Sequence, residues 1–218
     1  MAHARAGAFD AEALIQRVIA QTTRTGLTIR SVRELRASTV GGGHLGWMRV
    51  QTLVTPAGGF SWSVLEAGGS NRTRDKVFRP VLDGEAESWR AAGRDAAALT
   101  PAIYVFTALP AAGHGDLRFQ LTPRRADSRL VEGVLTVSAD GYPLRLEGVL
   151  ARSPSFWVKS VRIVRHYGRF AGVALPTALE TEADVKLVGR AVFSMRYRYD
   201  EVNGLAILRP VRTAESNP

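Results

Sequence analysis

Hydrophobic and polar residues alternate along several segments of the chain, and the pattern is clearest in residues 190–202. Every second residue there is apolar or aromatic, and most of the residues between them are polar or charged. This period of two is typical of a β-strand with one face toward a core and one toward water. Residues 59–64, 116–121 and 142–150 show the same period. We therefore expect strands in all four segments.

Glycine, asparagine and aspartate fall between the alternating segments, where short turns would join neighbouring strands. Their spacing predicts about four strands between Thr28 and Leu82 and about six between Asp116 and Gly204. Strands joined by short turns pair as antiparallel neighbours. The sequence thus predicts one long, curved antiparallel sheet.

Two segments have helical character. In residues 9–23 apolar side chains recur at helical spacing, and Asp10 occupies the position of an N-cap. Residues 82–99 are rich in alanine, with Asp83 as the candidate cap. The predicted fold is mainly β with two or three helices, an α+β fold in which the helices pack on the apolar face of the sheet.

Length and composition set the domain organisation and the class of partner. The 218 residues predict a single domain over residues 9–210, with a disordered N-terminal remnant (1–8) and a C-terminal tail (211–218). A net charge of +9 favours anionic partners, and peripheral contact with an anionic membrane is one expectation. The absence of cysteine excludes disulfides and thiolate chemistry.

The sequence offers no constellation typical of an enzyme. Gly41, Gly43 and Gly46 have the spacing of a dinucleotide-binding loop, but the following residues read as a strand, so a hairpin turn is the better interpretation. The four histidines are scattered without metal-ligand spacing. We predict no catalytic residue, no metal site and no cofactor, and hence a protein that is not an enzyme.

Nucleic-acid binding is also disfavoured. Arginines and tyrosines are interleaved in residues 193–199, which could suggest a basic stacking surface. Alternation places the arginines and the aromatic rings on opposite faces of a strand, whereas base stacking needs both on one face. We therefore expect no nucleic-acid partner.

The remaining class is a protein that binds an apolar ligand. A curved sheet of this size, covered by few helices, is difficult to fill with its own side chains, so we expect a cavity. An acyl chain suits such a site because its burial needs few polar contacts. The candidate lining residues are the apolar faces of the predicted strands: Phe60, Trp62, Val64, Leu117, Phe119, Leu121, Leu144, Leu146, Phe193, Met195, Tyr197 and Tyr199.

Three stretches, residues 60–87, 129–181 and 189–204, resemble the outer-membrane lipoprotein-sorting protein group, whose fold is similar to the LolA and LolB lipoprotein carriers. The resemblance is carried by a glycine turn before Ser70, by the pattern F-x-G-V-x-L-P ending at Pro176, and by an aromatic last strand closing on Asn203. These are strand and turn patterns, not catalytic ones.

The resemblance implies an unclosed half-barrel of about eleven strands, with helices as a lid over a cavity for acyl chains. It further implies a periplasmic carrier that supports outer-membrane lipoprotein sorting. Export is then expected, although the opening "MAHARAGA" lacks the apolar segment of a signal peptide. The cargo would be the acyl chains of lipoproteins or lipid. A second hypothesis is an envelope sensor that uses the same sheet to contact an envelope protein partner.

Overall fold

A computed structural model describes residues 11–22, 26–40, 43–57, 59–90, 98–110, 116–156, 158–186 and 189–207. The predicted N-terminal remnant (1–8), the tail (211–218) and the candidate cap Asp10 lie outside the described residues. The predicted domain division stays a prediction.

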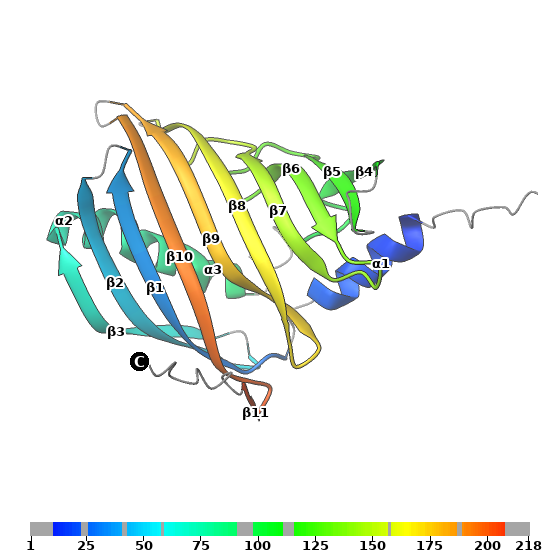
Figure 1. Ribbon diagram of the computed structural model, residues 1–218, viewed down its shortest axis with the longest axis horizontal. Coiled ribbons are helices and arrows are strands. Elements are labelled where there is room, and N and C mark those ends of the chain that lie inside the picture. The colour runs from blue at the N-terminus through cyan, green and yellow to red at the C-terminus, as the bar shows by residue number, and fades with distance from the viewer. Residues whose placement is uncertain are drawn as a thin grey trace, which may run out of the picture.

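In the described part of the chain, eleven strands form one antiparallel sheet (Figure 1). The sheet order is β3-β2-β1-β10-β9-β8-β7-β6-β5-β4, and β11 pairs with β10. β3 and β4 stand at opposite ends of this order and do not pair with each other, so the sheet is unclosed. The strands are β1 (Ile29–Thr39), β2 (His44–Val54), β3 (Phe60–Gly69), β4 (Tyr104–Leu109), β5 (Leu117–Pro123), β6 (Val131–Val137), β7 (Pro143–Leu150), β8 (Val158–Phe170), β9 (Val173–Val185), β10 (Gly189–Val202) and β11 (Leu205–Ala206).

The helices are α1 (Ala11–Thr22), α2 (Asn71–Thr73) and α3 (Arg79–Trp89), with a π-helical turn η1 (Arg74–Phe78) between the last two. Figure 1 shows α3 crossing behind β10 and β9, and α1 near the ends of β6 and β7. The helices pack on the sheet through a shared core. Leu14 and Val18 of α1 join Phe78 and Leu82 in a cluster with the inward residues of the strands. The predicted fold class is therefore confirmed.

The second helix begins earlier than the sequence predicts and α3 ends at Trp89, while residues 91–97 of the predicted segment lie outside the described residues. The helical segment starts at Asn71, where the Ser70 hydroxyl accepts a hydrogen bond from the Thr73 backbone N–H, and Asp83 lies inside α3. Gly69, just before this cap, has φ +79° and thus ends β3 in a conformation that favours glycine. Because residues 71–89 are helical, the described residues between Thr28 and Leu82 form three strands, not about four.

β8 and β9 form a long hairpin at the centre of the sheet. Ala171 and Gly172, at its tip, both have positive φ, as a tight two-residue turn requires. Pro176 lies in the interior strand β9, where the pairing register shifts between His166 and Tyr167 of β8. The sequence predicts an edge or a bend at Pro176; the structure places this residue in an interior strand, next to an irregularity in the β8–β9 ladder.

Candidate ligand cavity

A cavity of about 770 Å³ lies between the inner face of the sheet and the helices. Its wall is formed mainly by β8, β9 and β10, and its cover by α1 and α3. Most of the lining is apolar, and the volume falls in the usual range for small-molecule sites. The apolar lining residues of the three central strands are Val158, Val161, Ile163, Ala174, Pro176, Leu179, Ala183, Val185, Ala191, Val192, Phe193 and Met195.

Strand register arranges this wall in rows across the three strands. Arg165 pairs with Leu179, and Leu179 pairs with Met195. Further along the strands, Val161 pairs with Ala183, which pairs in turn with Ala191. Because side chains alternate between the faces of a strand, residues two apart on β8 and on β10 point to the same side. The rows therefore form a continuous inner surface from Arg165 to Val158 and Val185.

The structure brings four of the twelve candidate residues to the cavity wall: Leu146, Phe193, Met195 and Tyr197. Phe119 and Leu121 are fully buried in the core beneath β4–β6, and Leu117 packs against the same core. Ligand contact by any of the twelve stays a prediction.

The other five candidates lie elsewhere. Phe60 and Trp62 of the edge strand β3 face the guanidinium groups of Arg33 and Arg79, at 5.0 and 5.7 Å from the ring centroids. The remaining three do not line the cavity: Val64, which is exposed on β3; Leu144, which is half-buried; and Tyr199, which is buried in a second cluster and donates its hydroxyl to the Pro176 carbonyl.

A buried ion pair joins the sheet to α3 beside the cavity. Nη1 of Arg33 lies 2.5 Å from Oε2 of Glu85, and only 4% and 16% of the two side chains are exposed. The guanidinium also stacks between Phe60 and Tyr197, at 5.0 and 4.9 Å. Burial acts to lower the pKa of Arg33, but the Glu85 carboxylate favours the charged form, and the pKa is raised overall. The pair thus holds a charged link between β1 and α3.

Arg165 is a second charged group in the interior, on the cavity wall next to Tyr167. The side chain is half-buried, and its Nε has no hydrogen-bond partner among the residues that the structure describes. Burial acts to lower the pKa of Arg165, but Tyr167, Tyr197 and Glu85 favour the charged form and raise it overall. A cation therefore faces a largely apolar cavity.

Another ion pair joins the lining residue Arg129 to Asp127. Its Nε and Nη2 donate to the two carboxylate oxygens of Asp127, at 3.0 and 2.8 Å, and its backbone N–H donates to Oδ1 at 2.9 Å. The side-chain hydrogen bonds from Arg129 are the main cause that lowers the pKa of Asp127 to about 2.

This lowered pKa predicts an acid-dependent contribution to stability. The unfolded chain binds the proton more readily than the folded one, so the contribution is complete above about pH 4 and is lost as pH falls through about 2. When the pH is lowered from 5 to 2, the free energy of unfolding of the wild type should fall by about 1 kcal/mol more than that of Asp127→Asn. This figure is smaller than the pKa shift alone would give, because solvent screens the ion pair. Urea unfolding at several pH values measures the difference, and parallel profiles for the two proteins would contradict it.

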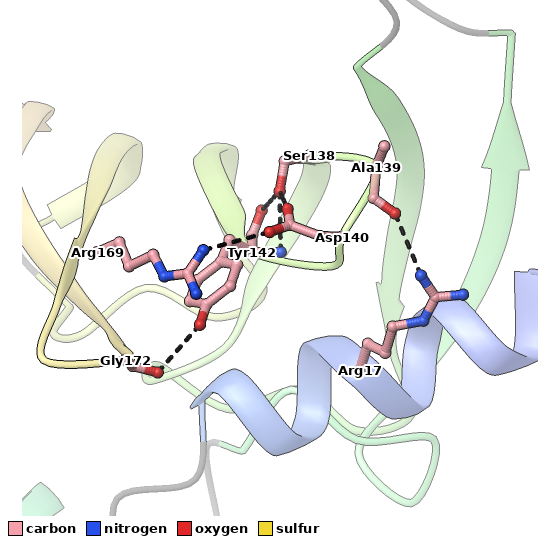
Figure 2. Close-up of polar contacts among 7 residues, drawn as sticks. All are labelled: Arg17, Ser138, Ala139, Asp140, Tyr142, Arg169 and Gly172. Carbon is pink, nitrogen blue, oxygen red and sulfur yellow. Dashed lines mark hydrogen bonds and ion pairs between the residues drawn. The ribbon is translucent and has the colours of Figure 1, made fainter.

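The turn between β6 and β7 holds α1 against the sheet (Figure 2). Arg17 of α1 donates to the Ala139 carbonyl at 3.3 Å, while the Tyr142 hydroxyl donates to Gly172 in the tip of the β8–β9 hairpin at 3.2 Å. Arg169 of β8 stacks on Tyr142 at 4.1 Å. α1 contributes lining residues to the cavity, so this turn positions part of the cavity's cover.

Neither a cluster of metal-ligating side chains nor a membrane-crossing helix is found among the residues that the structure describes. No three histidine, aspartate or glutamate side chains gather there as metal ligands. None of the described helices has the length and hydrophobicity needed to cross a bilayer.

Comparison with known proteins gives matches among solved structures alone. No family model and no curated protein matches the sequence. The chain is similar to a LolA superfamily protein from Nitrosomonas europaea (14% identity, TM-score 0.47) and to an outer membrane lipoprotein-sorting protein domain from Vibrio parahaemolyticus (14%, TM-score 0.46), each over 88% of this chain and 92% of the other. It is also similar to a DUF1329 family protein from Desulfovibrio piger (12%, TM-score 0.44), over 89% of this chain and 94% of the other. The structural neighbours of the chain thus include the group that the sequence resembles.

Proposed function

We propose that this protein is a carrier or binding protein that holds acyl chains in the cavity between its sheet and its helices. The observation that carries the proposal is the apolar lining of a cavity of about 770 Å³, formed along β8, β9 and β10. Burial of methylene groups in such a site contributes roughly 0.8 kcal/mol each, so a chain of ~16 carbons supplies on the order of 10 kcal/mol before ordering costs.

The natural cargo that we infer is the acyl chain of a lipoprotein or a lipid, carried in the periplasm in support of outer-membrane lipoprotein sorting. The protein would act as a chaperone for its cargo by shielding acyl chains from water, without catalysis. The net charge of +9 would favour the surfaces of anionic membranes, where such cargo is collected or delivered.

Filling the cavity tests the proposal. Ala183 and Ala191 are paired across β9 and β10 and both line the wall, so two phenylalanines there would occupy the space of an acyl chain. We expect the double variant Ala183→Phe/Ala191→Phe to bind a fluorescent fatty acid at least roughly 10-fold more weakly than the wild type. Fluorescence titration measures the affinity, and thermal unfolding checks that the variant is folded.

The matched control is Ala178→Phe, which makes the same change on β9 at a position that does not line the cavity. It should bind the probe as the wild type does. Equal binding by all three proteins, or no binding by the folded wild type, would overturn the proposed function.

A further inference from the structure

The interior of the cavity carries more positive charge than an acyl-chain site needs. Of the described residues in the lining, Glu85 is acidic, and Arg129 and Arg165 are basic. Arg129 is held by Asp127 in a bidentate pair. Arg165 is therefore the lining arginine for which the described residues show no carboxylate in direct contact.

Glu85 is shared between two cations. Its carboxylate lies 2.5 Å from Nη1 of Arg33 and also acts electrostatically on Arg165. One carboxylate thus serves two guanidinium groups, that of Arg33, which is buried, and that of Arg165, which is half-buried, so the described residues leave a net positive charge on this part of the wall. A buried charge without full compensation is costly, so an arginine retained on this wall favours a ligand that supplies the missing anion.

The neighbours of Arg165 could complete a site for an anion. Tyr167 is two residues away on the same face of β8, and both it and Tyr197 of β10 line the cavity together with Arg165. A guanidinium group offers five N–H donors, and a phenol adds an O–H donor. The buried Nε of Arg165 has no hydrogen-bond partner among the described residues, so the protein does not fully satisfy this guanidinium group.

The apolar part of the cavity wall begins next to the polar cluster of Arg165, Tyr167 and Tyr197. From the row of Arg165 and Leu179, the lining continues through Ala183 to Val185 on β9, six residues from Leu179 and roughly 20 Å of strand. A charged head at Arg165 would therefore leave a long apolar surface for a chain.

We propose that the cavity binds an amphiphile with an anionic head group, which Arg165 engages with the help of Tyr167 and Tyr197 while the acyl chain lies along β8, β9 and β10. This inference rests on the proposed function, because it names the chemical class of the molecule in the same cavity. A carboxylate and a phosphate head group share the required chemistry.

Three probes with the same monounsaturated hydrocarbon tail test the inference: oleate, oleoyl lysophosphatidate and the uncharged oleyl alcohol. Each displaces a fluorescent fatty acid from the protein, below the concentration at which the probe forms micelles. We expect the wild type to bind at least one anionic probe roughly 10- to 100-fold more tightly than the alcohol. The anionic probe with the larger gain in affinity over oleyl alcohol shows whether a carboxylate or a phosphate is the preferred head group.

Arg165→Met should remove this preference and leave the affinity for oleyl alcohol within roughly 3-fold of the wild type. Arg165→Lys keeps the charge and should restore part of the preference. Arg162→Met makes the same substitution on the same strand at an exposed position outside the lining, and should change nothing.

The outcomes separate the two proposals. If the wild type binds all three probes equally, the anionic head group is wrong while the acyl-chain cavity stands. If the folded wild type binds none of them, the proposed function itself fails. A preference for anions that persists in folded Arg165→Met would overturn the role of Arg165.

Discussion

Replacing Glu85 with glutamine is expected to lower the free energy of unfolding by about 3–5 kcal/mol. The substitution keeps the shape of the side chain but removes the charge that faces Arg33, whose side chain is only 4% exposed. Arg33 would then stay buried between Phe60 and Tyr197 without its counter-ion. Urea unfolding followed by tryptophan fluorescence measures the loss.

Two controls show whether the loss comes from the uncompensated charge. The double variant Arg33→Met/Glu85→Met removes both charges and should recover most of the stability, because an apolar pair of similar volume can replace a buried ion pair. Glu87→Gln removes an exposed partner of Arg90 on the same helix and should change stability by less than about 1 kcal/mol. A small loss in Glu85→Gln, equal to that of Glu87→Gln, would show that the pair is not buried.

Gly133→Ala is expected to lower the free energy of unfolding by about 3 kcal/mol, because the new methyl group has no space. Gly133 of β6 pairs directly with Gly148 of β7. A Cβ at Gly133 would overlap the Glu147 carbonyl oxygen and lie 2.6 Å from the Gly148 Cα. These are backbone atoms, so relief requires the two strands to separate. The measurement is again urea unfolding.

Gly84→Ala provides the matched control. Gly84 lies in α3, and a Cβ there would meet no atom within 4 Å. Alanine is the better helix former, so this variant should be more stable by about 0.5–1 kcal/mol. If Gly133→Ala were as stable as the wild type, the close approach of β6 and β7 would be wrong.

Several of the strands could be predicted because each of them carries its own signal. Alternation in residues 190–202 follows from one face of β10 packing inward, and it can be read without knowing the neighbouring strands. The second helix was less predictable. The prediction placed this helix at residues 82–99 because that segment is rich in alanine. The N-cap that starts the helical segment is Ser70, which lies far from the alanine-rich part.

The cavity wall could be predicted only in part, because alternation gives the face of a residue and not its place in the sheet. Phe119 and Tyr199 alternate as regularly as Met195, yet Phe119 fills the core near one end and Tyr199 belongs to a second cluster. Which strands lie at the centre depends on long-range pairing, and β1 pairs with β10 across most of the chain.

The charged residues of the interior were missed for the same reason. Arg33 and Glu85 come from distant segments, and nothing in the local pattern joins them. Arg165 had a usable signal, since strand parity places it on the same face as Tyr167, and both line the cavity. An arginine on the apolar face of a strand is the pattern that could have identified it.

Native mass spectrometry of the protein mixed with oleate tests most directly whether the cavity holds an acyl chain. We expect the wild type and Ala178→Phe to retain one or a few oleate molecules, and the folded Ala183→Phe/Ala191→Phe variant to retain none. Equal retention by the filled variant, or a wild type that stays free of ligand under the same conditions, would contradict an acyl-chain site between the sheet and the helices.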